Sequence, residues 1–319
     1  MRWLIASVVV VLATTARAQI VAFPAPSPPA LPSVASLGAA GATAQPERDH
    51  ATPLSQLRLA AAQGDAHAEN AIGAIYADGR GVKRDYRQAM AWFQKAADQG
   101  DATAEANIGV LYCYGLGVPR DYGQALVWLR KAADQGDAWA QTNIGYSYRE
   151  GWGVRLDYGQ AMASFQRAAD QGDATAETNM GYLYQNGLGV AQDHGQAMAW
   201  YRKAAALGNA DAEANIGVLY LEGLGIRTDY GQALHWFQLA AKHGSAVGQF
   251  GLGFLYAGGL GVVQDPSEAR YWMTKAAAQG DNDARAWLST YTDNGHTAPG
   301  LTSCGSGPIG GCPSLQLGY

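Results

Sequence analysis

The amino-acid sequence predicts an all-α protein, a solenoid of six helix-turn-helix repeats with a capping helix at each end. A glycine recurs every 36 residues from Gly64 to Gly280, and the sequence between these glycines is similar each time. A fixed period of 20–50 residues is typical of repeat architectures, in which each unit packs only against its neighbours. Apolar residues fall at helical spacing twice within each period, which indicates two helices in each unit.

The repeats form a continuous block. Residues 53–64 match the second half of a unit and 281–294 match a first half, so both are expected to cap the stack, which places the solenoid at 53–294. Terminal caps are needed where the core would otherwise be exposed. The six complete units are 65–100, 101–136, 137–172, 173–208, 209–244 and 245–280.

The second unit illustrates the expected pair of helices. Its first helix is predicted to begin after Asp101, an N-cap residue, and to end at Gly115, which suits the left-handed conformation of helix ends. The apolar face of this helix consists of Ala104, Ile108, Leu111 and Tyr112. Glycine costs about 1 kcal/mol inside a helix, so its recurrence predicts close approach of two helix backbones at Gly109, Gly145, Gly181, Gly217 and Gly253.

The second helix of this unit is predicted to begin at Asp121. Gln124 follows three residues later, a capping-box spacing in which each side chain satisfies a free backbone N–H of the other residue. The same pair, with Glu for Gln in the last unit, recurs in all six repeats. The inner face of this helix is expected to comprise Ala125, Trp128, Leu129, Ala132 and Ala133.

The two ends of the chain differ from the repeats. Residues 1–18 contain Arg2, an apolar run and a small-residue motif at Ala16–Ala18, and they predict a cleaved signal peptide; the alternative is an uncleaved anchor helix. Residues 19–52 are rich in proline and alanine and are expected to form a linker. Residues 295–319 are a glycine-rich tail.

Charge and cysteine content limit the possible partners and sites. The net charge is −5, and it becomes −7 without residues 1–18, which carry two arginines and no acids. This acidic balance argues against nucleic-acid binding. Cys304 and Cys312 are close enough in sequence to form a disulfide, whereas Cys113 is expected to be a small buried or groove-facing residue. The six histidines lie in different units or in the flanks and predict no metal site.

The repeated residues resemble the Sel-one-like repeat (SLR) family, a relative of the tetratricopeptide repeat. The resemblance rests on Asn107-Ile-Gly109, on Gly115-x-Gly117-Val118 and on Asp121-Tyr-x-Gln-Ala-x-x-Trp128, with their copies. It implies a right-handed superhelix and a scaffold or adaptor that holds other proteins or peptides. In bacteria, exported members of the family act in envelope regulation, surface assembly or contact with host cells.

The sequence contains no catalytic arrangement, and no cofactor is expected. The paired glycines such as Gly115 and Gly117 suit a turn between helices better than a phosphate loop, and no serine or cysteine has a plausible base. The asparagine at 107, 143, 179 and 215 is interpreted as structural, with ligand binding as the alternative. A cysteine-rich branch of the family has been described as binding or cleaving β-lactams, but its repeat cysteines are absent here.

Binding residues are sought among positions that vary between repeats. In tetratricopeptide-like solenoids the first helices line a concave groove, and this register transfers to the present chain as a prediction. The third and fourth repeats combine aromatic and polar side chains at these positions, although the aromatics could instead pack between units. The predicted partner-binding residues are Tyr114, Trp139, Thr142, Tyr146, Arg149, Glu150, Thr175, Tyr182, Gln185 and Asn186.

These observations predict an exported, non-enzymatic scaffold that binds a protein or peptide in its groove. The periplasm or the exterior of a bacterium is the expected location, and the endoplasmic reticulum is the corresponding location in a eukaryote. The alternatives are a β-lactam-binding or β-lactamase-like enzyme and a purely structural spacer without a ligand.

Overall fold

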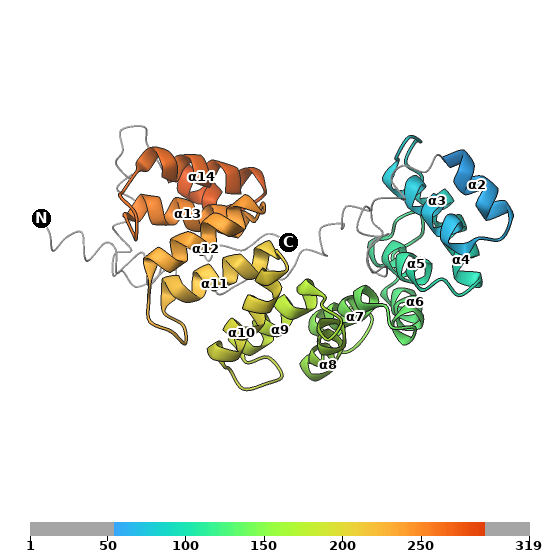
Figure 1. Cartoon of the computed structure of the whole chain (residues 1–319), viewed down its shortest axis with the longest axis horizontal. Coiled ribbons are helices and arrows are strands. Elements are labelled where there is room, and N and C mark those ends of the chain that lie inside the picture. The colour runs from blue at the N-terminus through green and yellow to red at the C-terminus, as the bar shows by residue number, and fades with distance from the viewer. Residues whose placement is uncertain (1–53, 291–319) are drawn as a thin grey trace, which may run out of the picture. The chain divides into compact units, whose positions relative to one another are not determined.

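A computed structural model describes residues 54–290, all of whose regular elements are α-helices (Figure 1). The predicted signal peptide, the proline-rich linker and the tail with Cys304 and Cys312 lie outside the described residues. The all-α fold class is confirmed, since the regular elements of these residues are all helices and consecutive helices pack in pairs in the first three and the last two repeats.

Each complete repeat contributes two helices of 12 or 13 residues, and a shorter helix flanks the series at either end. The helices are α2 (Leu54–Ala62), α3 (Ala66–Asp78), α4 (Tyr86–Asp98), α5 (Ala102–Tyr114), α6 (Tyr122–Asp134), α7 (Ala138–Glu150), α8 (Tyr158–Ala169), α9 (Ala174–Asn186), α10 (His194–Ala206), α11 (Ala210–Glu222), α12 (Tyr230–Lys242), α13 (Ala246–Gly258), α14 (Pro266–Ala278) and α15 (Asn282–Thr290).

The described residues divide into two compact units. The first comprises 54–183 and 187–191, and therefore holds α2 to α8 and most of α9. The second comprises 184–186 and 192–290, and it holds the end of α9 and α10 to α15.

The predicted boundaries of the first helix are confirmed. The Asp101 carboxylate accepts a hydrogen bond of 2.7 Å from the Ala104 N–H, and the equivalent residue caps the other first helices. At the other end, Gly115 adopts a φ of 67°, in the left-handed region, and its N–H donates to the Leu111 carbonyl. The cap glycine thus ends the helix where the sequence predicts.

At the second helix only half of the predicted capping box forms. The Asp121 carboxylate accepts from the Gln124 N–H at 2.9 Å, as expected. The Asp121 N–H, however, donates to the Tyr112 carbonyl of the preceding first helix at 3.0 Å, and the equivalent bond recurs in every repeat. The predicted bond between the Asp121 N–H and the Gln124 side chain was therefore wrong. The main-chain bond to Tyr112 satisfies this N–H instead, and it connects the second helix of each repeat to the first helix of the same repeat.

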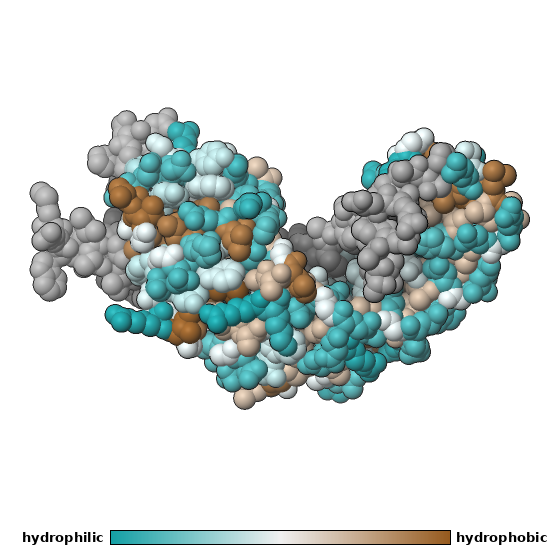
Figure 2. Space-filling model, in the orientation of Figure 1, coloured by the Kyte–Doolittle hydropathy of each residue, from teal (hydrophilic) through white to brown (hydrophobic). Residues whose placement is uncertain are grey.

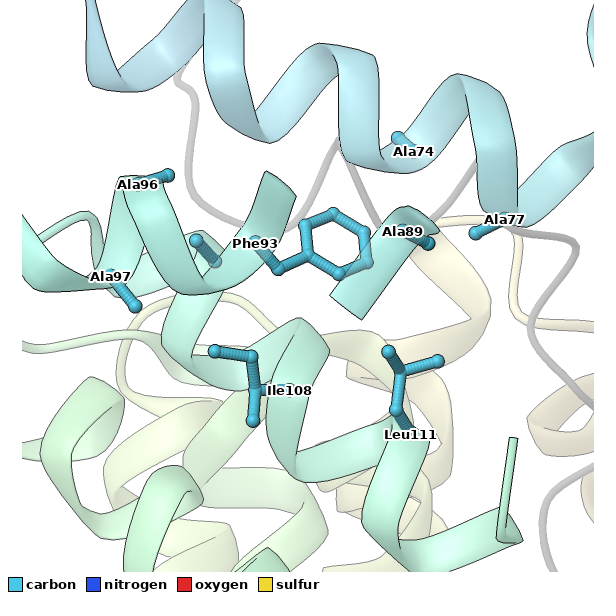
Figure 3. Packing of buried hydrophobic residues seen from close by; sticks show 9 residues of the cluster. Ala74, Ala77, Ala89, Phe93, Ala96, Ala97, Ile108 and Leu111 are labelled. Atoms are coloured by element: carbon cyan, nitrogen blue, oxygen red, sulfur yellow. The ribbon is translucent and has the colours of Figure 1, made fainter. Parts of the chain in front are cut away.

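The core of a repeat lies between its own helices and the first helix of the next repeat. Figure 3 shows the Phe93 ring of α4 between the alanines of α3 and the side chains of α5. Phe93 and Ile108 are fully buried, and Leu111 is almost so. The first helix is enclosed by helices on several sides, so residues 104–111 are all buried instead of forming the single apolar face that was predicted.

The glycines inside the first helices make room for a side chain more than for a helix backbone. A Cβ at Gly145 would lie 2.5 Å from the Phe165 ring, and one at Gly217 would lie 2.7 Å from the Phe237 ring. A Cβ at Gly109 would lie 2.8 Å from Leu129 Cγ and 3.2 Å from a backbone atom of the second helix, the Ala125 carbonyl oxygen. The predicted close approach is real, but the large residue of the second helix accounts for it.

A side-chain pair not predicted from the sequence links the two helices of most repeats. Gln135, at the end of α6, donates to the buried Glu105 carboxylate near the start of α5 at 2.8 Å. The two residues are 30 positions apart, and the same spacing joins Gln99 to Glu69, Gln171 to Gln141, His243 to Glu213 and Gln279 to Gln249. In the fourth repeat the exposed Leu207 takes the glutamine position.

Both predicted caps are helical. In the first unit, Leu57 and Ala61 of α2 pack against Ile72 and Ile75 of α3. In the second unit, Trp287 and Leu288 of α15 cover a cluster that contains Met273. The end helices therefore cover the terminal repeats.

Candidate functional site

The third and fourth repeats bring together a cluster of five residues, which we call the tyrosine–arginine cluster. Tyr146, Arg149 and Glu150 come from α7, and Asn179 and Tyr182 come from α9. All five belong to the first compact unit. Because α7 and α9 are the first helices of successive repeats, the cluster spans two neighbouring first helices on the face that they share, called here the first-helix face.

Arg149 is the centre of this cluster. Its guanidinium carbon lies 4.9 Å from the centre of the Tyr146 ring and 5.5 Å from that of the Tyr182 ring, both within cation–π range. Its Nε donates to the Glu150 carboxylate at 2.6 Å, and its Nη1 donates to Asn179 Oδ1. Although charged, the side chain is only 7% exposed, so these contacts compensate for the loss of water.

Asn179 connects the two helices. Its Nδ2 donates to the Tyr146 hydroxyl at 3.0 Å and to the Thr175 carbonyl at 2.7 Å. The rings of Tyr146 and Tyr182 are both half-buried, and burial raises the pKa of Tyr182, an effect that the Arg149 charge partly offsets. Tyr146 also meets Phe165 edge to face, with ring centres 5.5 Å apart, so the core of its own repeat holds it in place.

One polar atom of the cluster lacks a hydrogen-bond partner among the described residues. Arg149 Nη2 is buried and has no hydrogen-bond acceptor among the residues that the structure describes. Buried donors in folded proteins are nearly always paired, and an unpaired one costs about 1–3 kcal/mol. The cluster therefore holds a strong donor that an outside acceptor could satisfy.

The other predicted binding residues differ in burial and in the compact unit to which they belong. Thr142 and Gln185 are buried, each 2% exposed, and Gln185 accepts a hydrogen bond from the Tyr201 hydroxyl at 2.8 Å. Trp139 is half-buried and packs on the core between the second and third repeats, as the alternative interpretation of the aromatics expected. Thr175 is exposed, while Tyr114 and Asn186 are half-buried. Gln185 and Asn186 belong to the second compact unit, apart from the cluster.

Sequence reasoning missed the part that Asn179 plays. The recurring asparagine was interpreted as structural, and its side chain does form hydrogen bonds at positions 107, 143 and 179. At 179, however, it also holds the arginine and a tyrosine of the candidate site. Arg149 could have indicated this role of Asn179, because it is the one charged residue at its position in the repeats. The equivalent positions carry Ala77, Cys113, Gln185, Leu221 and Ala257.

The described residues offer neither a metal site nor a reactive thiol. Within residues 54–290 no group of three or more potential ligand side chains could hold a metal ion. Burial raises the pKa of Cys113 to about 12, which leaves this thiol unreactive at neutral pH. In the same range, no helix has the length and apolar character that crossing a bilayer requires.

The surface shows where apolar side chains lie outside the cluster. On the face drawn in Figure 2, polar side chains cover most of the surface, and apolar surface gathers over α2 and over α12 and α13. The large apolar residues that are most exposed are Leu59 on α2 and Val263 after α13. These two patches lie in different repeats and contain no buried unpaired donor comparable to that of Arg149.

Comparison with known proteins agrees with the six-repeat fold. The Sel1 repeat profile matches six consecutive segments, residues 66–101, 102–137, 140–173, 174–209, 210–245 and 246–281. No curated protein matches the chain.

Two solved structures are similar over most of the chain. One is a protective antigen present in uropathogenic Escherichia coli strains, described as displaying an SLR fold: it is 38% identical over 73% of this chain, with a TM-score of 0.63. The present chain spans only half the length of that antigen. The other is a Sel1 repeat protein from Oxalobacter formigenes, 35% identical over 71% of this chain and all of its own length, with a TM-score of 0.65.

Proposed function

Because the chain belongs to the Sel1 repeat family, we propose that it is a non-enzymatic scaffold that binds a peptide or a segment of another protein on the first-helix face of its third and fourth repeats. Proteins of this fold commonly act in protein interaction, since stacked repeats offer an extended surface. The tyrosine–arginine cluster is the proposed centre of that surface.

One observation carries the proposal. Residues that hold the helices together recur from repeat to repeat, whereas Arg149 occurs once at its position and lies between two tyrosine rings. Tyrosine and arginine are the side chains that most often dominate binding energy at interfaces, each contributing about 2 kcal/mol or more. Within the described repeats, the cluster thus departs from the residues that recur in the framework.

We also propose that the protein acts after export. The support is the sequence of residues 1–18, in which a short apolar run follows Arg2 and precedes small residues at Ala16 and Ala18. In a bacterium the protein would then act in the periplasm or outside the cell. Edman sequencing of the protein from its native source would begin at Gln19 if the leader is removed there, and at Met1 if it is kept.

The binding proposal is tested by crosslinked pull-down with single variants. Tyr182→Ala and Arg149→Met are expected to reduce recovery of the specific partner at least tenfold. Tyr271→Ala is the matched control, because it removes an exposed tyrosine from a second helix, α14. Recovery that is equal for all three variants and the unchanged protein would refute this site, provided that circular dichroism shows the same helix content.

No observation favours the β-lactam alternative. Of the three cysteines in the sequence only Cys113 lies in a repeat, and it forms no disulfide within residues 54–290. Hydrolysis of a chromogenic β-lactam above the level of heat-inactivated protein would nevertheless overturn the assignment as a non-enzymatic scaffold.

A further inference from the structure

The tyrosine–arginine cluster has the properties of a site for a proline-rich segment, and the chain carries such a segment itself. We propose that residues 24–32, Pro-Ala-Pro-Ser-Pro-Pro-Ala-Leu-Pro, dock on the first-helix face at this cluster and compete with its partner. This inference rests on the proposed function, because it names the ligand class of the same surface.

The cluster and the proline-rich segment have complementary hydrogen-bonding groups. Arg149 Nη2 is a buried donor without an acceptor in the described part of the chain. A proline-rich segment is the opposite case, since a polyproline II helix has no internal hydrogen bonds and proline lacks an N–H, so its carbonyls are acceptors without donors. Because Nη2 is buried, a carbonyl reaches it only when the side chains that cover it move.

The spacing of the prolines matches that of the tyrosines. A polyproline II helix has three residues per turn and rises about 3.1 Å per residue, so every third residue lies on one side at intervals of about 9 Å. Pro26, Pro29 and Pro32 follow this spacing. Tyr146 and Tyr182 occupy the same position in neighbouring repeats, and the axes of packed helices lie about 8–10 Å apart. Successive prolines can therefore meet successive tyrosine rings, the contact that polyproline-binding grooves use.

The charges of the cluster suit a neutral ligand. Glu150 pairs with Arg149 at 2.6 Å, which balances the one positive charge of the cluster. An anionic ligand would gain little there, whereas a neutral one faces no unbalanced charge. The chain from Ala18 to Pro46 contains no Asp, Glu, Lys or Arg, so the proline-rich segment is neutral.

The segment is also long enough to reach. The chain from Pro32 to Leu54, where α2 begins, is about 22 residues long and can extend to roughly 70 Å. At most five helix-to-helix steps lead from α2 to α7 within the same compact unit, which amounts to roughly 50 Å. A tethered ligand of this kind acts at an effective concentration in the millimolar range.

The test is a fluorescence anisotropy titration with a labelled peptide of residues 23–33 and the full chain. The unchanged chain is expected to bind this peptide at least tenfold more weakly than a chain with Pro26→Ala, Pro29→Ala and Pro32→Ala, whose own segment no longer competes. Adding Tyr182→Ala to that variant should abolish binding, and adding Tyr271→Ala should leave it unchanged. Tyr182→Leu keeps apolar volume at the site and should also abolish binding, which guards against a folding defect.

Three results would overturn the proposal: no binding of the peptide to the triple variant, equal binding to the triple variant and the unchanged chain, or binding that survives both changes at Tyr182. Failure of this proposal can be distinguished from failure of the proposed function. If the peptide does not bind while partner recovery still depends on Tyr182 and Arg149, the scaffold assignment stands and only the proline-rich ligand is wrong.

Discussion

Single residues determine how closely the two helices of a repeat approach. Gly145 lies against the fully buried Phe165, and a Cβ at Gly145 would stand 2.5 Å from its ring. We expect Gly145→Ala to destabilise the protein by about 1–3 kcal/mol, the usual cost of overpacking a core. This effect should exceed the gain of about 1 kcal/mol that alanine brings to a helix. Urea unfolding followed by circular dichroism measures the change.

The control for this prediction is Gly159→Ala. Gly159 is exposed on α8, and the nearest atom to an added Cβ is Asp157 Oδ1 at 3.3 Å. The stability of the Gly159→Ala protein should change little or rise slightly. A Gly145→Ala protein as stable as the original would show that Phe165 can move and that the close contact is unimportant.

Asp137 predicts a pH dependence. This carboxyl caps α7 and is 7% exposed, and burial, partly offset by its backbone hydrogen bonds, raises its pKa to about 6 from 3.8. Between pH 4 and pH 6 the folded protein therefore binds more protons at this site than the unfolded chain, so its contribution to stability falls as pH rises. Asp137→Asn should cap equally well, as Asn209 does in the fifth repeat.

Since one pKa unit corresponds to about 1.4 kcal/mol, Asp137→Asn should stabilise the protein by roughly 1–2 kcal/mol at pH 7 and hardly at all at pH 4. Thermal unfolding at both pH values tests this. A variant less stable than the original at pH 7 would mean that the buried carboxylate is better compensated than its surroundings suggest.

At this scale the contacts of single residues are hard to predict from the sequence. Arg149 was predicted to bind a partner, which stays a prediction, and its contact with Asn179 was not predicted, because a local pattern does not state which side chains of neighbouring repeats meet. Gln185 shows the same limit: it shares the register of Arg149, yet Tyr201 holds it in the core.

At the level of helices, the pair between Glu105 and Gln135 joins the start of one helix to the end of the next. Burial raises the pKa of Glu105, and the hydrogen bond from Gln135 opposes that rise. Gln135→Ala should therefore leave a buried carboxylate without its donor and cost about 1–2 kcal/mol near neutral pH. The midpoint of urea unfolding measures this loss.

Glu105→Gln is the matched control, because it copies the Gln141–Gln171 pair of the third repeat and should cost much less. Equal stability of the Gln135→Ala protein and the original would contradict a stabilising role for this pair.

Helix boundaries were predictable because their signals are local. Asp101 and Gly115 cap their helix as expected, since an N-cap carboxylate and a left-handed glycine act within a few residues. The return bond from Asp121 to Tyr112 was not predictable in the same way, because it depends on how the second helix folds back on the first.

At the level of the whole molecule, the 36-residue period predicted the all-α fold, and the comparisons place the chain in the Sel1 repeat family. The identity of a partner is not encoded in that period, because constant residues build the stack and only varied residues can recognise a ligand. The proposed function therefore rests on the few positions, chiefly Tyr146, Arg149 and Tyr182, at which two repeats depart from the others.

Site-specific photocrosslinking from the first-helix face is the most direct test of this division between framework and binding residues. A benzophenone amino acid would be placed at position 175, which is exposed on α9 beside Asn179 of the cluster, and, as a control, at position 271, and the proteins would be irradiated in the native host. The predicted result is a discrete crosslinked partner from position 175 that disappears with Arg149→Met and is absent from position 271. Identical crosslinks from both positions, or crosslinks indifferent to Arg149, would contradict it.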